Sequence, residues 1–102
     1  SVIAFVRSDQ EDEKIIAVCN FTPVLRKDYK IGVPESESYE LVFNSDSQKF
    51  GGTGEKIKKT YKTIDGEMHG YKQYIELTLP PMTTLYFKQK KAEVPSAKKV
   101  KK

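Results

Sequence analysis

The chain has 102 residues, of which 31% are charged, and its formal net charge is +4. This length allows one domain with its own core. No apolar run approaches the roughly 18 residues that a membrane-spanning helix needs, so we expect no membrane partner. The positive charge is concentrated at one end, because residues 90–102 carry +5 whereas residues 1–89 sum to −1.

Residues 1–89 and 90–102 are therefore expected to behave differently. The first range holds the apolar segments and should fold as one β domain. The second range, KKAEVPSAKKVKK, has too few large apolar residues to fold and should be a disordered basic tail. Its lysines could attract nucleic acid, but the body has no basic patch interleaved with aromatic residues. We expect a solvated tail and no nucleic-acid partner.

The body consists of short runs rich in β-branched and aromatic residues, each ended by turn formers. In chain order, the predicted strands are residues 2–7, 14–21, 29–34, 38–44, 55–64, 72–79 and 82–88. The second strand is apolar at every position from Ile15 to Cys19, as in a strand covered on both faces. Asp65-Gly66 reads as a turn after the fifth strand.

Seven strand candidates without a helical period predict an all-β fold, an antiparallel β-sandwich of about seven strands. Two facing sheets would bury one side of each strand. The predicted core residues are Val2, Ala4, Val6, Ile16, Val18, Leu41, Phe43, Ile75, Leu77, Leu79, Leu85 and Phe87.

Few residues of the chain suit catalysis or metal binding. The one cysteine, Cys19, and the one histidine, His69, are far apart in sequence and do not make a zinc site of about four ligands. We expect no catalytic, cofactor-binding or metal-binding residue. A single cysteine allows no internal disulfide, which fits a reducing, cytoplasmic location. The glycosylation sequon at residues 20–22 ends an apolar strand, and we interpret it as chance.

The segment FNSDSQKFGGTG, residues 43–54, has glycines and serines that could cradle a phosphate. It lacks the spacing of a P-loop, and no predicted helix follows whose N-terminus could hold an anion. Its glycines more simply supply positive φ for a tight reversal. In that interpretation Phe50 packs against the sheet.

Three motifs occur in order along the body: V-C-N-F-T-P at 18–23, N-x-D with F-G-G-x-G at 44–54, and L-T-L-P-P-x-x-x-L at 77–85. Together they resemble the C-terminal β domain of bacterial glycogen branching enzymes, in the α-amylase superfamily. The resemblance runs from Ser1 to about Lys88. It implies a Greek-key β-sandwich beside a catalytic (β/α)₈ barrel, which moves α-1,4-glucan chains to make α-1,6 branches.

What the resemblance implies for this chain is a non-catalytic accessory role, because the catalytic residues of the family belong to the barrel. The domain would stabilise the barrel, its partner in the same parent chain, and influence chain transfer. The start of the chain inside a strand fits a piece cut from a longer protein. The residues expected to dock against the barrel are Asn44, Asp46, Phe50, Gly51 and Gly52.

An alternative function is an independent α-glucan-binding module, since sugars stack on exposed aromatic rings. The candidate weak glucan contacts are Tyr39, Tyr61, Tyr71 and Tyr74. In either case an isolated domain would expose the apolar patch that the barrel covers, so we expect it to dimerise at high concentration.

Overall fold

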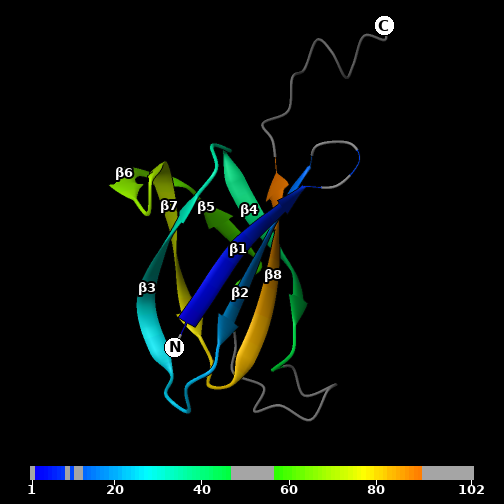
Figure 1. Cartoon of the computed structure of the whole chain (residues 1–102), viewed down its shortest axis with the longest axis vertical. Helices are drawn as coiled ribbons and strands as arrows, with labels where there is room; N and C mark the ends of the chain where they lie inside the picture. The colour runs from blue at the N-terminus through cyan, green and yellow to red at the C-terminus, as the bar shows by residue number, and fades with distance from the viewer. Residues whose placement is uncertain (1, 9, 11–12, 47–56, 91–102) are drawn as a thin grey trace, which may run out of the picture.

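The computed structural model describes residues 2–8, 10, 13–46 and 57–90. Every regular element within these residues is a strand (Figure 1). The strands are β1 (Val2–Ser8), β2 (Lys14–Asn20), β3 (Arg26–Val33), β4 (Ser38–Asn44), β5 (Thr60–Lys62), β6 (Ile64–Met68), β7 (Tyr71–Leu79) and β8 (Thr83–Lys90). No helix in this part of the chain is long and apolar enough to cross a membrane.

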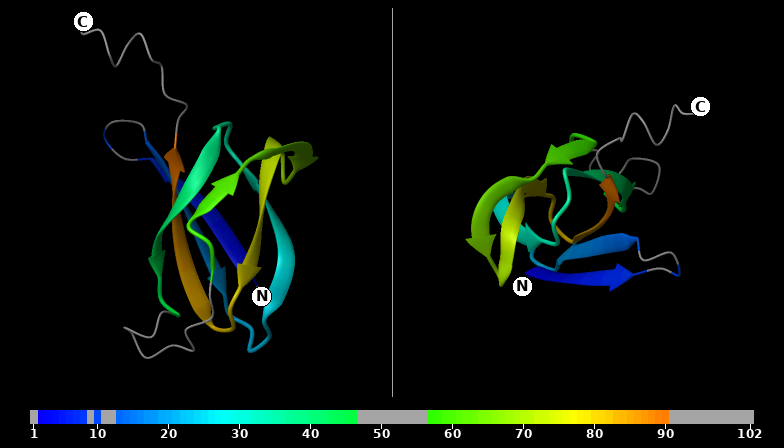
Figure 2. Two further views of the ribbon diagram at one scale, coloured as in Figure 1. Left: turned by 180° about the vertical axis from the view of Figure 1, so that it is seen from behind. Right: turned by 90° about the horizontal axis from the view of Figure 1, so that it is seen from above.

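The predicted all-β sandwich is confirmed, with two sheets of unequal width. The larger sheet has the order β1-β2-β8-β4-β5, and the smaller has the order β3-β7-β6. All of their pairings are antiparallel. Seen from above in Figure 2, the larger sheet curves around the smaller one, with β1 at its free edge.

The core lies between the two sheets. Its buried members are Ile16, Val18, Ile31, Val33, Tyr39, Leu41, Tyr61, Ile75, Leu77, Leu79, Leu85 and Phe87. Most of the predicted core is therefore confirmed. The exceptions on β1 are Val2 and Val6, which are half-buried, and Ala4, which is exposed. The smaller sheet is two strands narrower, so it leaves the inner face of this edge strand partly uncovered.

The prediction that Phe43 belongs to the core is wrong. The pairing of β4 with β8 shifts between Leu41 and Phe43, so that Leu41 opposes Phe87 but Phe43 opposes Tyr86. An extra residue at a bulge reverses the alternation of the side chains that follow it. Phe43 therefore lies on the outer face of the larger sheet.

The predicted turn at Asp65-Gly66 is also wrong, because both residues lie within β6, where Asp65 pairs with Gln73. The chain turns instead at His69-Gly70, whose φ angles are 53° and 83°. Two consecutive positive φ angles are what a tight two-residue hairpin requires. Within the described part of residues 55–64, the single predicted strand is replaced by β5 and by the first residue of β6, whereas the strand predicted for residues 72–79 is β7.

At the C-terminal end, β8 includes Lys90, which the sequence assigned to the tail. Residues 91–102 lie outside the described residues, so the disordered tail stays a prediction.

Candidate interaction face

The outer face of the larger sheet carries an apolar row that crosses four strands. Its members, one from each of β1, β2, β8 and β4, stand in register: Phe5, Ala17, Tyr86 and Phe43. The rings of Phe43 and Tyr86 have their centroids 5.2 Å apart. The three aromatic side chains are between 36% and 45% exposed. We call these four residues the outer apolar row.

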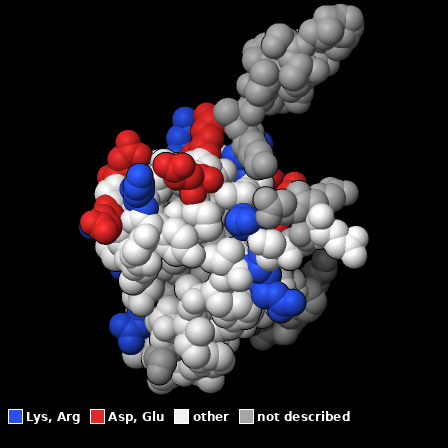
Figure 3. All heavy atoms as spheres, turned by 45° about the horizontal axis from the view of Figure 1, so that its top comes forward, with Lys and Arg blue, Asp and Glu red and all other residues white. Residues whose placement is uncertain are grey.

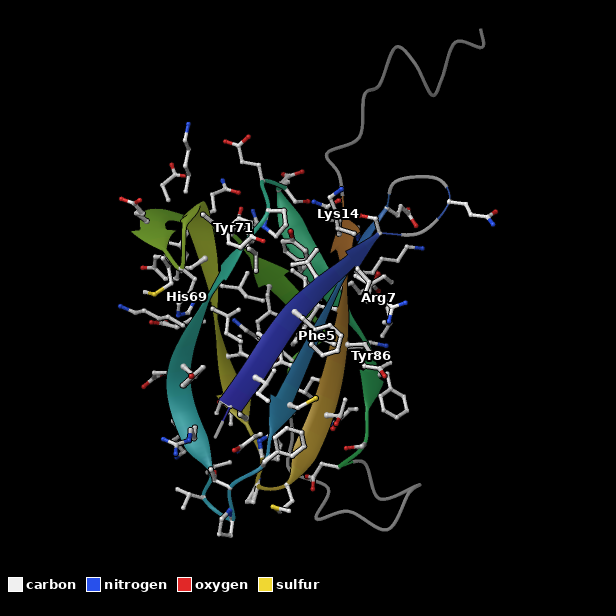
Figure 4. The ribbon with its side chains drawn as sticks, in the orientation of Figure 1. Phe5, Arg7, Lys14, His69, Tyr71 and Tyr86 are labelled. Atoms are coloured by element: carbon white, nitrogen blue, oxygen red, sulfur yellow. The ribbon has the colours of Figure 1, made fainter. Side chains whose placement is uncertain are left out.

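The row is flanked by further apolar side chains on the same face. Ile3, which is 49% exposed, pairs with Cys19 on one side of the row, and Arg7 pairs with Ile15 on the other. Arg7 and Ile15, together with Phe5, Ala17 and Tyr86, line a shallow groove of about 470 Å³. Figure 4 shows Phe5 and Tyr86 directed toward one another across this groove, with Arg7 above them.

Charged groups border the row rather than interrupt it. On the side of Arg7, Lys88 Nζ lies 3.1 Å from Glu13 Oε1, and Lys14 Nζ donates to Ser8 Oγ at 3.2 Å. In Figure 3 the acidic side chains gather near the top of the molecule, whereas Lys and Arg side chains also run down the right of its centre beside uncharged surface. An apolar centre rich in aromatic residues with a polar rim that includes arginine is the usual composition of a protein interface.

The first and third sequence motifs meet at one buried asparagine. The side chain of Asn20, only 1% exposed, donates to the carbonyl oxygens of Val24 and Pro80, each at 3.0 Å. Its Oδ1 accepts from Thr22 N–H at 3.1 Å and from Thr22 Oγ1 at 2.6 Å. This Asn20 clamp joins the loop after β2 to the turn before β8. Its burial supports the interpretation of the sequon as chance, because Asn20 is not accessible to a modifying enzyme.

The second motif begins with a turn that is anchored on β8. Asn44 Oδ1 accepts from Asp46 N–H at 2.8 Å, and Ser45 Oγ accepts from Thr84 N–H at 2.9 Å. Asp46 is buried. Asn44 directly follows Phe43, so the loop that was expected to dock starts at the edge of the outer apolar row. Phe50, Gly51 and Gly52 lie outside the described residues, and their docking role stays a prediction.

Two of the four tyrosines expected to contact glucan cannot do so in this structure. Tyr39 and Tyr61 are 0% and 2% exposed, inside the core. Burial raises the pKa of each to about 12, so both hydroxyls stay protonated. Tyr39 Oη donates to the carbonyl oxygen of Pro34 at 2.6 Å, whereas Tyr61 Oη has no hydrogen-bond partner among the described residues. The expectation for these two residues is corrected, because the alternation of β4 and β5 turns their rings inward.

The other two tyrosines remain within reach of a ligand. Tyr71 and Tyr74 are both half-buried but lie on opposite faces of β7. Tyr74 lies on the outer face of the smaller sheet, where the Nζ of Lys30 is 5.3 Å from its ring centroid. Tyr71 faces the gap between the sheets, beside β3 and β1.

No group of three or more acidic, histidine or cysteine side chains among the described residues is placed to hold a metal ion. His69 has a local partner instead, because its Nδ1 accepts from Gly32 N–H at 3.1 Å. Cys19 is a free, half-buried thiol on the outer face, and it accepts from Thr84 Oγ1 at 3.6 Å.

Sequence reasoning missed the outer apolar row, although one signal pointed to it. The run from Ile15 to Cys19 is apolar at consecutive positions. One face of β2 packs in the core, so the other face, with Ile15 and Ala17, needs a cover of its own. Phe43 and Tyr86 could not be added to this face from sequence, because a bulge decides where Phe43 lies.

Comparison with known proteins agrees with this architecture. Residues 1–90 match the family model of the alpha amylase C-terminal all-beta domain. The chain is 48% identical over 92 residues to the 1,4-alpha-glucan branching enzyme GlgB of Francisella philomiragia, a match that covers 89% of this chain and 14% of that enzyme. It is 44% identical over 89 residues to GlgB of Halothermothrix orenii, covering 86% of this chain and 14% of that enzyme.

The chain therefore spans about one seventh of the length of the curated relatives that it matches. The resemblance that rested on three motifs is confirmed over nearly the whole described body. On this evidence, the chain belongs to the family of alpha-amylase C-terminal all-β domains, in the form that branching enzymes carry.

Proposed function

We propose that this chain is a non-catalytic accessory domain of a glycogen branching enzyme, and that it stabilises the catalytic barrel by packing its outer apolar row against it. The observation that carries the proposal is the row itself: four side chains in register across four strands, three of them aromatic and exposed. Exposed apolar patches of this kind mark interaction surfaces.

The partner that covers the outer apolar row can be inferred from the length of the related enzymes. The branching enzymes matched here are about seven times longer than the matched segment. Most of such a parent chain lies outside this domain and must meet it somewhere. A partner within the same chain needs no separate association step, because the linkage supplies a high effective concentration.

The position of the second motif supports the same face. The 44–54 loop leaves β4 at Asn44, next to Phe43 of the outer apolar row. A barrel docked on the row would then also reach Asn44, where the segment expected to dock begins. An influence on chain transfer and a cytoplasmic location are parts of the same proposal, the latter because Cys19 is a free thiol.

The test uses a full-length branching enzyme that contains this chain. Tyr86→Asp places a carboxylate in the middle of the outer apolar row, and a buried charge without a partner destabilises by about 3–5 kcal/mol. We expect a lower Tm of the parent enzyme and faster loss of branching activity on heating. The matched control is Tyr74→Asp, which changes the same residue type on the outer face of the smaller sheet.

The experiment is interpreted from the difference in thermal stability between the two variants of the parent enzyme. If Tyr86→Asp lowers the thermal stability of the parent enzyme much more than Tyr74→Asp, the larger sheet is the docking face. Equal effects, or a larger effect of Tyr74→Asp, would contradict the proposal. The same two substitutions in the 102-residue chain measure what each costs the domain itself.

A further inference from the structure

The strand β1 is a free edge without the features that usually protect one. Among the described strands it pairs with β2 alone, as the view from above in Figure 2 shows. Its sequence, VIAFVRS, has no proline, glycine or lysine, and its register with β2 runs from Val2 to Ser8 without a bulge. Proteins usually protect an edge with such residues or with a bulge, because a regular unpaired edge is a template for another strand.

The hydrogen bonds of the larger sheet show which backbone groups of β1 are directed away from β2. Ser45 N–H donates to the carbonyl oxygen of Thr84 at 3.0 Å, so the backbone groups of Thr84 point toward β4 and those of its two neighbours toward β2. In an antiparallel ladder this direction alternates from residue to residue. Carried through the registers of β8 with β2 and of β2 with β1, the alternation directs Val2, Ala4 and Val6 toward the open side of β1.

An apolar cleft of about 360 Å³ runs along this open side. Ala4, Phe5 and Val6 all line it. Consecutive side chains point to opposite faces of a strand, so the cleft meets β1 along its backbone edge. Ala4 is exposed and Val6 is half-buried, although both side chains point to the inner face of the sheet. In Figure 4 this cleft lies between β1 and β3.

The strand across the cleft, β3, is also an edge of its sheet, but this edge is partly closed. Gly32 N–H donates to His69 Nδ1 at 3.1 Å, so this donor is not available to an added strand. Met68 lies against the same glycine, where an added Cβ would clash with Met68 O. A further strand in the cleft can therefore pair with β1 but not with β3 at Gly32.

The surroundings of the free edge specify which side chains an added strand would carry. Those on its inner face would fill the cleft, whose described lining includes Ile16 and Ile31 and no charged side chain. Those on its outer face would lie beside Ile3 and Phe5, which are 49% and 45% exposed. The fitting partner is therefore an extended segment with apolar side chains on both faces.

We propose that an extended apolar segment of the parent branching enzyme adds to the free edge of β1 as a further strand of the larger sheet. The inference rests on the proposed function in one respect, that the rest of the parent chain packs against this domain. The matched relatives are about seven times longer than the matched segment, and covalent linkage supplies such a segment at high effective concentration. Phe5 belongs to the outer apolar row and also lines the cleft, so the added strand extends the docking face at its edge.

The main-chain hydrogen bonds of an added strand provide the test. Backbone amide hydrogen exchange is measured, at single-residue resolution by mass spectrometry, in the 102-residue chain and in the full-length branching enzyme that contains it. In the 102-residue chain the amide of Phe5, directed toward β2, should exchange slowly, and those of Ala4 and Val6 rapidly. In the parent enzyme we expect Ala4 and Val6 to exchange at least about tenfold more slowly.

Two outcomes of this measurement would overturn the proposal. One is that Ala4 and Val6 exchange equally fast in the two forms. The other is that their exchange already slows in the 102-residue chain as its concentration rises, which would assign the free edge to a second copy of this chain.

A pair of proline variants tests the same ladder by stability. Proline is tolerated in an edge strand where its position directs no N–H to a neighbour. In the 102-residue chain Ala4→Pro should therefore lower the Tm much less than the matched control Phe5→Pro, which removes an N–H directed toward β2. In the parent enzyme both N–H groups are bonded, so the two variants should lower the Tm by similar amounts. If Ala4→Pro stays the milder change there, no strand is added.

The docking face and the added strand can fail separately. If Tyr86→Asp destabilises the parent enzyme but Ala4 and Val6 exchange as fast there as in the 102-residue chain, the docking face stands and the added strand is overturned. If Ala4 and Val6 are protected in the parent enzyme while Tyr86→Asp behaves like Tyr74→Asp, the added strand stands and the docking face is overturned.

Discussion

The two outer faces of this sandwich contrast in what they leave exposed. The larger sheet presents the outer apolar row, crossed by no charge. On the outer face of the smaller sheet, Lys30 and Glu76 stand opposite one another on β3 and β7, an arrangement that stabilises neighbouring strands. The first face has the composition of an interaction surface, whereas the second exposes charged side chains to water.

The smaller sheet also covers part of its own outer face. The hairpin of β6 and β7 folds back until Met68 and His69 lie against Gly32, where an added Cβ would clash with Met68 O. Gly66 packs in the same way on the ring of Tyr74. This packing covers part of that side, where Ile64, paired with Tyr74, is still 40% exposed.

The first prediction concerns the Asn20 clamp, which supports the sandwich beneath both outer faces. Asn20→Ala removes the clamp between the loop after β2 and the turn before β8, leaving buried carbonyl groups without donors. We expect it to lower the free energy of unfolding by about 3 kcal/mol, measured by urea denaturation. Asn44→Ala, which loses the hydrogen bond from Asp46 N–H within a turn, should cost only about 1 kcal/mol. Comparable costs for the two asparagines would refute the clamp.

The second prediction tests whether the hairpin of β6 and β7 packs against Gly32 of β3. Gly32→Ala forces the hairpin away from β3 and should cost about 2–3 kcal/mol. Gly70→Ala is the control, because Gly70 has a φ of 83° but open space around it. Its strain should cost about 1 kcal/mol. If unfolding experiments rank Gly70→Ala as the more damaging change, the hairpin does not lie on Gly32 as described.

The third prediction concerns association of the isolated chain. With the barrel absent, we expect the outer apolar row to drive dimerisation at high concentration, measured by sedimentation equilibrium. Tyr86→Asp should weaken the dimer by at least about tenfold, while Tyr74→Asp should leave it unchanged. A wild-type chain that stays monomeric at millimolar concentration would contradict this expectation.

The fourth prediction compares Tyr39 and Tyr61, two buried tyrosines whose hydroxyl groups differ in hydrogen bonding. Tyr39→Phe loses the hydrogen bond to Pro34 and should cost about 1 kcal/mol. Tyr61→Phe removes a buried hydroxyl that finds no partner within the part of the chain that the structure describes, so stability should stay the same or rise. Urea denaturation of both variants checks this, and a larger loss for Tyr61→Phe would show that its hydroxyl is satisfied.

The smallest expected effect is a pH dependence at the alkaline end. Burial raises the pKa of Tyr61 to about 12 in the folded chain, against an ordinary value of 10.0. The unfolded chain therefore loses its proton first as the pH rises, so the stability present below pH 10 falls between pH 10 and 12. This fall should be shallower in Tyr61→Phe than in the wild-type chain, and equal slopes in unfolding experiments would contradict it.

Much of the fold was predictable where local pattern and tertiary packing agree. The run around Leu77 and the run around Leu85 alternate cleanly, and both are strands whose apolar sides lie in the core. The motifs were a sound guide to the family, and the Asn20 clamp gives a physical reason for two of them. Asn20 and Pro80 are far apart in sequence but bonded in the fold.

The remaining features depend on pairings that sequence does not display. The bulge between Leu41 and Phe43 moves an aromatic ring from the core to the outer face. Asp65-Gly66 carries a turn signal, yet pairing with β7 holds it in a strand. The outer apolar row likewise depends on the register of four paired strands, which no single segment of the sequence reveals.

The measurement that tests the docking face most directly is side-chain oxidative footprinting of the 102-residue chain and of the full-length branching enzyme that contains it. Our account predicts that Tyr86 and Phe43 are labelled readily in the isolated chain and are strongly protected in the parent enzyme. Tyr74, on the smaller sheet, should be labelled equally in both. Unchanged labelling of Tyr86, or protection of Tyr74 instead, would contradict the assignment of the larger sheet as the docking face.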